Sequence, residues 1–508
     1  MQRPTAKAVA TGAALLILLA GCGGKDDSKG SDTPKSGDTP ATPAPPPVAS
    51  FDPPKGLTAV AAYGVPADKA RAADASLAAG MVGQTALVVG RTGLTGRNIA
   101  GQREPFTVLA TEKADTVTTN GNSGVMPVKL DGKDVAVVAY AQTDKGGGTQ
   151  KAKGQVVIQW IDAADGKKVA EITVDVSAKF GPGTLVEGIG SRTYDPATGQ
   201  VALGLGSRTE GAAKNGSSDF TVYADPKTQK ANIVPFLTPA GLLNGTIVGA
   251  KASNSEGAHD GTIVVYDGAT GKISKQIPTK MDYLTPAVGG SKHAYLNGSS
   301  YVPNSKSMVY TYDSGLYAVD IATGTLVGQT KSTLGTEKSY GYSCVADQAT
   351  AVVCSTGQNM GTEEIIGIDD TTGKKAWGYN KNSASRVVPI ISGAFHGVAY
   401  GRADDQPVML DAKTGADIPQ PSTAPTTTPS TTPSTGSTPT DAGNVTPTTG
   451  VPGDDVGSKF GSDMSLYDPK LGTPAPEAIS PYGATYLQTD KGDSYDTDKI
   501  LIAMKPTA

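Results

Sequence analysis

A short turn motif that recurs along the chain constrains its fold more than any other feature. The motif is clearest at Asp369-Asp370-Thr371-Thr372-Gly373-Lys374-Lys375-Ala376-Trp377, which follows the apolar run 365–368. In such a turn the aspartate carboxylate accepts hydrogen bonds from the next backbone N–H groups, and glycine adopts the positive φ that other residues avoid. The pattern predicts a β-strand that ends in a tight reversal. Further copies begin at Asp162, Asp225, Asp267, Asp320 and Asp411, with glycines that include Gly271, Gly324 and Gly415.

Pairs of apolar segments accompany these turns, and the turns recur at roughly 40 to 60 residues. The first clear pair is 135–140 with 156–161, a later one is 308–312 with 315–319, and the last is 483–487 with 499–503. This period is typical of a β-propeller with four strands in each blade. We therefore predict an all-β fold: a β-propeller of seven blades, with eight as the alternative, each blade a four-stranded antiparallel sheet. One or two β-sandwiches remain the competing interpretation.

A propeller must join its two ends to avoid leaving an open sheet edge. We expect the last strand pair to close the ring against an N-terminal strand near Thr85. The propeller is predicted to span residues 57–508. A Pro/Thr-rich stretch at about 418–458 has no residues to build a core, so we interpret it as a disordered insertion between the last two blades. A linker between two domains is the other interpretation of this stretch.

The turn motif resembles the propeller repeat of pyrroloquinoline-quinone (PQQ) proteins, Ala-x-Asp-x-x-Thr-Gly-Lys-x-x-Trp. Residues 369–377 match its Asp, Thr, Gly, Lys and Trp positions, and residues 318–324 match its first half. The resemblance implies a propeller in which Trp377 docks onto the neighbouring blade. In other copies the tryptophan position holds Lys275, Gly328 or Ala170, so the chain is similar to looser propellers of exported lipoproteins. Neither PQQ nor Ca²⁺ is predicted as a cofactor.

The N-terminus carries the pattern of an exported bacterial lipoprotein. Arg3 and Lys7 precede the apolar run 13–20, which is too short to span a bilayer, and Leu19-Ala20-Gly21-Cys22 resembles a lipobox. We predict that residues 1–21 are a signal peptide, that Cys22 carries the lipid, and that 22–56 form a disordered tether. The protein would then be anchored at the extracytoplasmic face of the cell membrane. A buried N-terminal helix is the alternative.

Two cysteines remain, Cys344 and Cys354, on either side of a predicted hairpin turn at 347–350. In an exported protein such a pair is expected to form a disulfide. A redox-active pair is the alternative, although the spacing is not that of a Cys-x-x-Cys motif.

Charge and motif content limit the functions that the sequence supports. Charged residues make up 18% of the chain and the net charge is −4, so a nucleic-acid partner is not expected. No histidine or cysteine spacing indicates a metal site. The acidic stretch 490–498 has oxygens suited to Ca²⁺, but a solvated loop is the simpler interpretation.

We therefore predict a non-enzymatic binding or scaffold module of the cell envelope, with a protein, peptide or glycan as partner. Tyr340 and Tyr342 are the candidate ligand contacts, because tyrosine offers apolar area and a hydroxyl together. Two enzymatic alternatives stay open: a quinone-dependent dehydrogenase, and a glycosidase or lyase that uses paired carboxylates.

Overall fold

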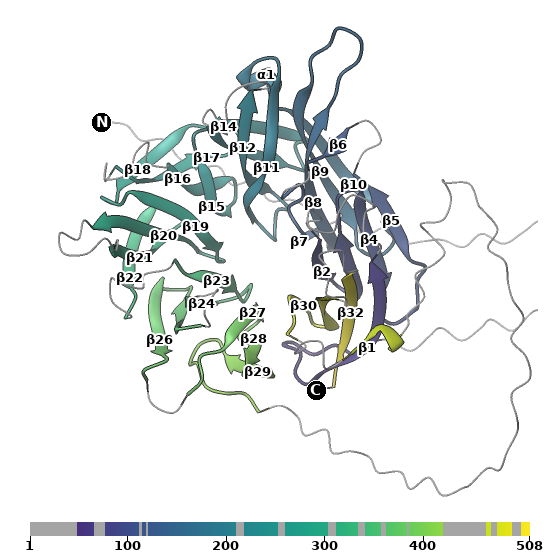
Figure 1. Cartoon of the computed structure of the whole chain (residues 1–508), viewed down its shortest axis with the longest axis vertical. Coiled ribbons are helices and arrows are strands. Elements are labelled where there is room, and N and C mark those ends of the chain that lie inside the picture. The colour runs from purple at the N-terminus through teal and green to yellow at the C-terminus, as the bar shows by residue number, and fades with distance from the viewer. Residues whose placement is uncertain are drawn as a thin grey trace, which may run out of the picture. The chain divides into compact units, whose positions relative to one another are not determined.

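The computed structural model describes residues 48–65, 77–110, 114–117, 120–209, 218–251, 260–302, 311–333, 341–356, 362–383, 386–419, 464–468, 475–489 and 499–507. All of them belong to one compact unit, Pro47–Ala508. Within these residues the strands form eight antiparallel sheets arranged in a ring (Figure 1). The protein is a β-propeller.

The first four blades follow one another along the chain. Blade 1 contains β2 (Ala78–Val82), β3 (Thr85–Val89), β4 (Gly93–Asn98) and β5 (Phe106–Leu109). Blade 2 contains β6 (Asp115–Thr116), β7 (Met126–Leu130), β8 (Lys133–Asp144), β9 (Lys153–Asp162) and β10 (Lys168–Asp175). Blade 3, preceded by the short helix α1 (Ser177–Phe180), contains β11 (Thr184–Tyr194), β12 (Val201–Thr209), β13 (Ser218–Asp225) and β14 (Lys230–Pro235). Blade 4 contains β15 (Thr238–Leu243), β16 (Thr246–Lys251), β17 (Thr262–Asp267) and β18 (Ile273–Pro278).

The remaining blades complete the ring. Blade 5 contains β19 (Tyr283–Gly289), β20 (His293–Val302), β21 (Thr311–Asp320) and β22 (Thr325–Lys331). Blade 6 contains β23 (Ser343–Ala346), β24 (Ala351–Thr356), β25 (Glu364–Asp369) and β26 (Lys374–Asn380). Blade 7 contains β27 (Ile390–Phe395), β28 (Val398–Ala403) and β29 (Gln406–Asp411). Blade 8 contains β30 (Ala478–Ser480), β31 (Gly483–Thr489), β32 (Lys499–Pro506) and β1 (Leu57–Val65), and the short helix η4 (Met464–Leu466) precedes it.

Blade 8 closes the ring by joining the two ends of the chain. Its outer strand β1 pairs antiparallel with β32, with Leu57 opposite Pro506 and Val65 opposite Lys499. The closing strand is therefore 57–65, and the prediction that the ring closes against a strand near Thr85 was wrong. Thr85 begins β3, the second strand of blade 1. Strand β1 escaped notice because three of its nine residues are alanine, which has a low preference for strands.

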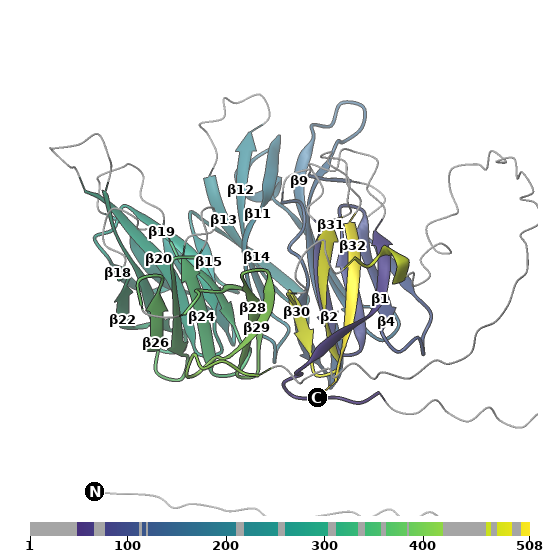
Figure 2. The same cartoon turned by 60° about the horizontal axis from the view of Figure 1, so that its bottom comes forward.

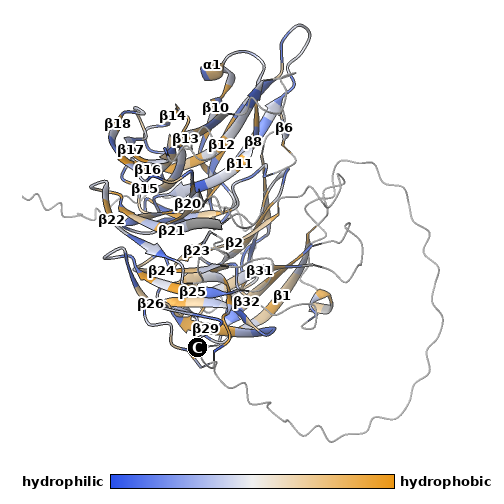
Figure 3. Cartoon of the chain, turned by 60° about the vertical axis from the view of Figure 1, so that its left-hand side comes forward, coloured by the Kyte–Doolittle hydropathy of each residue, from blue (hydrophilic) through white to orange (hydrophobic). Residues whose placement is uncertain are grey.

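The core consists of eight apolar clusters, one between each pair of neighbouring blades within the described residues. Successive side chains of a strand point to opposite faces of its sheet, so a middle strand contributes to two clusters. In β24, Val352 and Cys354 pack against blade 5, whereas Ala351 and Val353 pack against blade 7. This two-sided burial explains the apolar runs of middle strands such as β3 and β24, and many strands of the ring carry hydrophobic residues (Figure 3).

The six aspartate turns join the third strand of a blade to the next segment outward. In the turn after β25, Asp369 Oδ1 accepts the Thr371 N–H at 2.8 Å and Gly373 has a φ of 67°. Glycine has the same left-handed conformation at Gly271, Gly324 and Gly415, and Gln229 adopts it in the turn that lacks glycine. These turns lie on one face of the ring, which we call the turn face, together with the turns between first and second strands. Connections between second and third strands lie on the opposite face (Figure 2).

Two details of the predicted strand map differ from the structure. The first choice of seven blades was wrong and the alternative of eight is confirmed, because blade 1 has no aspartate turn and its third strand, Gly-Leu-Thr-Gly-Arg-Asn, is not apolar. Segments 308–312 and 315–319 are not two strands of a hairpin. Residues 311–320 form the single strand β21, in which Gly315 lies opposite Gly298 and makes room for the Gln329 side chain.

Candidate central binding cavity

The first strand of each blade faces the axis of the ring, and these eight inner strands enclose a central cavity of about 540 Å³. The wall residues come from all eight blades, for example Met81 of blade 1, Ala240 of blade 4 and Ile479 of blade 8. Many of the wall residues are small, so the backbones approach the axis without filling the channel. A volume of this size is within the range that encloses small ligands in proteins.

Bulges in four inner strands shape the wall. The register of β11, β15, β19 and β27 shifts by one residue against the neighbouring strand, and the skipped residues are Gly190, Ala240, Ala287 and Ser392. All four line the cavity. A bulge leaves one residue unpaired and redirects the side chains after it. The bulges thus alter the ladder of the inner strands beside the cavity.

Arg192 is the one cation among the described residues of the wall. It follows the bulge at Gly190 and extends toward blade 2, where the inner strand is broken between β6 and β7. The broken segment includes Gly124, whose φ is 66° and whose position leaves no room for a Cβ beside Arg192 Nη1. A backbone hydrogen bond of 2.8 Å from Ile189 N–H to Asn120 O joins the two blades next to this contact. Because residue 124 is glycine, the Arg192 guanidinium can lie directly against the backbone at this position.

The Arg192 guanidinium is surrounded by the blades of the ring, but it is accessible from the central cavity. The Arg192 side chain is exposed although blades surround it, because it projects into the cavity. Desolvation lowers the pKa of Arg192, and the neighbouring Tyr194 hydroxyl acts in the opposite direction. Burial likewise raises the pKa of Tyr194. Among the described residues, no carboxylate lies within ion-pair distance of Arg192 and no acceptor within hydrogen-bond distance.

Glu477 is the one carboxylate among the described wall residues. Burial raises its pKa, while a hydrogen bond from the Leu487 backbone and the charge of Lys499 lower it less strongly. Glu477 lies three residues before the end of β30 at Ser480, and Arg192 lies two residues before the end of β11 at Tyr194. The two charges therefore belong to the same wall but to different blades, 8 and 3.

The predicted disulfide is present and forms part of the same wall. Cys344 on β23 and Cys354 on β24 are bonded, and they are directly opposite partners with a Cα–Cα distance of 4.0 Å. Cys344 lines the cavity, whereas Cys354 is fully buried against blade 5. The hairpin turn between them is capped by Asp347, whose Oδ1 accepts the Thr350 N–H at 2.8 Å.

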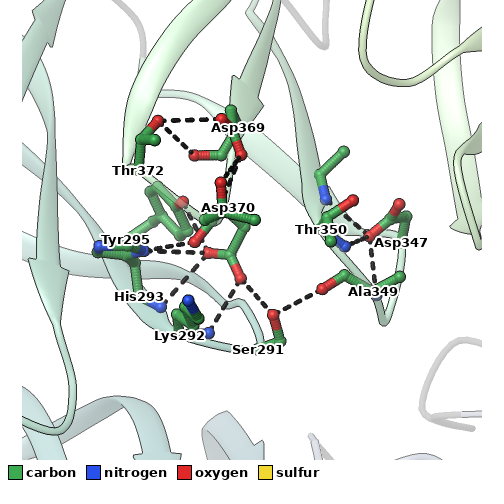
Figure 4. A network of polar contacts seen from close by, with 12 residues as sticks. Ser291, Lys292, His293, Tyr295, Asp347, Ala349, Thr350, Asp369, Asp370 and Thr372 are labelled. Atoms are coloured by element: carbon green, nitrogen blue, oxygen red, sulfur yellow. Dashed lines mark hydrogen bonds and ion pairs between the residues drawn. The ribbon is translucent and has the colours of Figure 1, made fainter.

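A polar network near the turn face contains Ser291, His293 and Asp370, the residue types of a hydrolytic triad (Figure 4). Its geometry is different: Ser291 Oγ lies 2.7 Å from Asp370 Oδ2, and His293 Nδ1 donates to the main-chain oxygen of Asp370 at 2.7 Å. Burial is the strongest influence on Asp370 and opposes its charge. Hydrogen bonds from His293, Ser291, Tyr295 and the Lys292 N–H together outweigh burial and hold the pKa of Asp370 below its usual value. This network ties blade 5 to blade 6.

Tyr342 and Trp377, two of the residues predicted from sequence, form contacts that stabilise the ring. Tyr342 is only 4% exposed, and its hydroxyl donates to Glu364 Oε2 at 3.0 Å, so its side chain is not offered at the surface. Trp377 donates from Nε1 to Ala412 O of blade 7 at 2.9 Å and so contacts the next blade. Tyr340, Cys22 and the acidic stretch 490–498 lie outside the described residues.

Sequence reasoning did not single out Arg192 or Glu477. The only signal for Arg192 is its place in Gly-Ile-Gly-Ser-Arg-Thr-Tyr, shortly before the turn at Asp195, where an inner strand approaches the axis.

The described residues do not fit the cofactor of the resembled repeat. PQQ carries several carboxylates, and the described wall provides Arg192 as its only cation. Within the described ranges no group of three or more His, Cys, Asp or Glu residues is placed to hold a metal ion. The described part of the chain also contains no helix with the length and apolar character needed to cross a membrane.

No protein family model matches the chain. No curated protein matches it either. Among solved structures, the β-propeller domain of the Trilobed protease from Pyrococcus furiosus is 9% identical over 58% of this chain and 84% of its own, with a TM-score of 0.33. Sqt1 from Saccharomyces cerevisiae is 12% identical over 73% and 88%, with a TM-score of 0.37. These similarities are too low to carry an argument, so the assignment as a propeller rests on the eight sheets of the chain itself.

Proposed function

We propose that this protein is a lipid-anchored, extracytoplasmic binding module that receives its ligand in the central cavity. The observation that carries the proposal is the cavity of about 540 Å³, whose wall is contributed by all eight blades and contains an enclosed, unpaired guanidinium. The Arg192 guanidinium has no carboxylate partner among the described residues and is exposed to the cavity, so it is available to an anionic ligand. The lipobox-like segment at Cys22 supports attachment to the membrane.

The ring is suited to binding because its eight interfaces hold the wall rigid. Each interface has its own apolar cluster, and cross-blade hydrogen bonds reinforce several of them. A rigid wall loses little conformational entropy when a ligand enters, which favours affinity. The proposal assigns no reaction to the cavity.

Photo-crosslinking in intact cells tests the proposal. A photoreactive phenylalanine analogue is placed at Ala287 on β19, which lines the cavity, or at Leu326 on β22, the exposed outer strand of the same blade. We expect ligand or partner adducts from position 287 and none from position 326. Adducts only from position 326, or equal adducts from both, would show that the cavity is not the binding site. Steady turnover of a substrate by the purified protein would replace the binding role with an enzymatic one.

A further inference from the structure

The cavity contains one cation that the described part of the chain leaves without a partner. The Arg192 guanidinium lies against Gly124. The nearest titratable group on its own strand is Tyr194, which is neutral at physiological pH. Among the described residues the only carboxylate of the same wall is Glu477, on blade 8, and no ion pair joins the two. A guanidinium with five donors in a fixed fork is therefore open to an anion that enters the channel.

The charge of the cavity selects among anions. Arg192 and Glu477 are the only charged side chains that the described wall contributes, so the wall has no excess positive charge. A singly charged carboxylate matches the fork of one guanidinium with two parallel hydrogen bonds. One guanidinium matches one negative charge, and a phosphate dianion would bring a second one into a cavity whose wall also contains Glu477. The balance of charges favours a monocarboxylate.

The rest of the wall indicates what the carboxylate is attached to. Besides the two charged residues, the wall mixes apolar side chains, such as Val125 and Val288, with polar ones, such as Asn122, Thr193 and Gln348. Such a surface can remove apolar groups of a ligand from water and also form hydrogen bonds with its polar groups. The volume accommodates a short chain rather than a polymer.

We infer that the central cavity binds a small monocarboxylate whose stem carries both apolar and hydrogen-bonding groups, such as the free carboxyl end of a short peptide, with the carboxylate paired to the Arg192 guanidinium. This inference rests on the proposed binding function and names the ligand class of the same cavity. The stem lies along the mixed wall, and Glu477 disfavours ligands with a second negative charge.

Calorimetric titration of the purified full-length protein in detergent tests the inference. The probes are N-acetyl-alanyl-alanine, its C-terminal amide, which differs only in lacking the charge, and inorganic phosphate. We expect the free acid to bind at least about tenfold more tightly than the amide or phosphate, because a charge-assisted fork is lost in the amide. Equal affinity for acid and amide, no heat from the acid at millimolar concentration, or tighter binding of phosphate would overturn the inference.

Variants locate the contact and guard against misfolding. Arg192→Gln should weaken binding of the acid by about tenfold or more, whereas Arg208→Gln, which removes an exposed arginine from β12 of the same blade, should leave it unchanged. Glu477→Gln, which does not touch Arg192, should raise the affinity for phosphate. The Arg192 Nε–H resonance of protein labelled with ¹⁵N-arginine should shift with the acid and not with the amide. An unshifted resonance, or equal effects of the two arginine variants, would also overturn the assignment.

The two proposals fail in distinguishable ways. If acid and amide bind alike while position 287 still forms adducts in cells, the cavity binds a ligand of another chemistry. If position 287 forms no adducts, the binding function itself fails.

Discussion

Tyr295 and Asp370 lie in different blades, yet the Tyr295 hydroxyl donates a hydrogen bond of 2.8 Å to Asp370 Oδ1. The same carboxylate accepts the Lys292 N–H at 3.0 Å and lies 2.7 Å from Ser291 Oγ. Its neighbour Asp369 has a different task, because it caps the turn of its own blade. Asp369 thus stabilises the turn within blade 6, and Asp370 joins blade 6 to blade 5.

Replacing each aspartate by alanine should separate these tasks. Asp370→Ala leaves several buried donors without an acceptor, and we expect a loss of about 3 kcal/mol or more in the free energy of unfolding. Asp369→Ala removes only an exposed cap and should cost about 1 kcal/mol. Urea denaturation of both variants measures the difference. Equal losses would show that the cross-blade network contributes nothing beyond the turn.

His293 should make the stability depend on pH near neutrality. Burial lowers the pKa of His293, but its interactions with Asp370 outweigh burial and the net pKa is raised. A raised folded-state pKa gives stability that is fully present below the unfolded value of about 6.5 and is lost as the pH rises through the folded pKa. The free energy of unfolding of the wild type should therefore fall relative to that of His293→Gln as the pH rises above about 6.5. Parallel profiles for the two proteins in this range would contradict the prediction.

The docking of Trp377 onto blade 7 can be measured with two glycine variants. A Cβ at Gly415 would lie 2.5 Å from Trp377 Cε3, whereas a Cβ at Gly132 would meet nothing within 4 Å. Both glycines have positive φ, 70° and 78°, so both alanine variants carry similar backbone strain of about 1 kcal/mol. We expect Gly415→Ala to cost a further 1–3 kcal/mol, roughly the cost of overpacking. Equal melting midpoints of the two glycine variants would show that Trp377 moves aside without a loss of stability.

Reduction of the disulfide should loosen blade 6. Cys344 and Cys354 are separated by 10 residues, for which the loop-entropy model gives a stabilisation of about 2–3 kcal/mol. We expect denaturation of the wild type to shift by this amount in reductant. The double variant Cys344→Ala/Cys354→Ala serves as the control and should not respond to reductant. If the wild type also fails to respond to reductant, the disulfide does not contribute to the free energy of unfolding.

Lipid attachment at Cys22 predicts the location of the protein. Cys22→Ala should move it from the membrane fraction to the soluble fraction, and labelling with an alkyne-tagged fatty acid should disappear. The double cysteine variant of blade 6 should remain in the membrane fraction. Membrane association that survives in Cys22→Ala would contradict the anchor.

Much of the fold was readable from sequence because turn chemistry is local. Asp and Gly at fixed offsets specify a reversal wherever they occur, and two-sided burial makes the middle strands apolar. Blade 1 has no aspartate turn, and only β3 of its two middle strands is apolar, which is why the predicted number was one too low. Gly315 was taken as the start of a separate strand, but it lies inside the long strand β21, where close packing against Gln329 requires glycine.

The cavity was not readable in the same way. Arg192 and Glu477 are 285 positions apart in the sequence, and nothing local indicates that they share a wall. Their relationship depends on the number of blades, on the bulge at Gly190 and on the break in the inner strand of blade 2. Such features follow from the assembled ring and have no signature in a single segment. Tyr342, by contrast, matched a surface pattern but was needed as a partner for Glu364.

Because the two ends of the ring pair with each other in blade 8, the chain could begin at another point of the ring and still form the same blades. Leu57 lies opposite Pro506, and the Thr507 N–H donates to Gly56 O at 3.0 Å, so the ends of the ring meet. A circular permutant that joins residue 507 to residue 56 and opens at the short β28–β29 turn would retain every strand pairing. A protein fused after residue 507 would emerge beside residue 56, at the point where the N-terminal segment enters the ring.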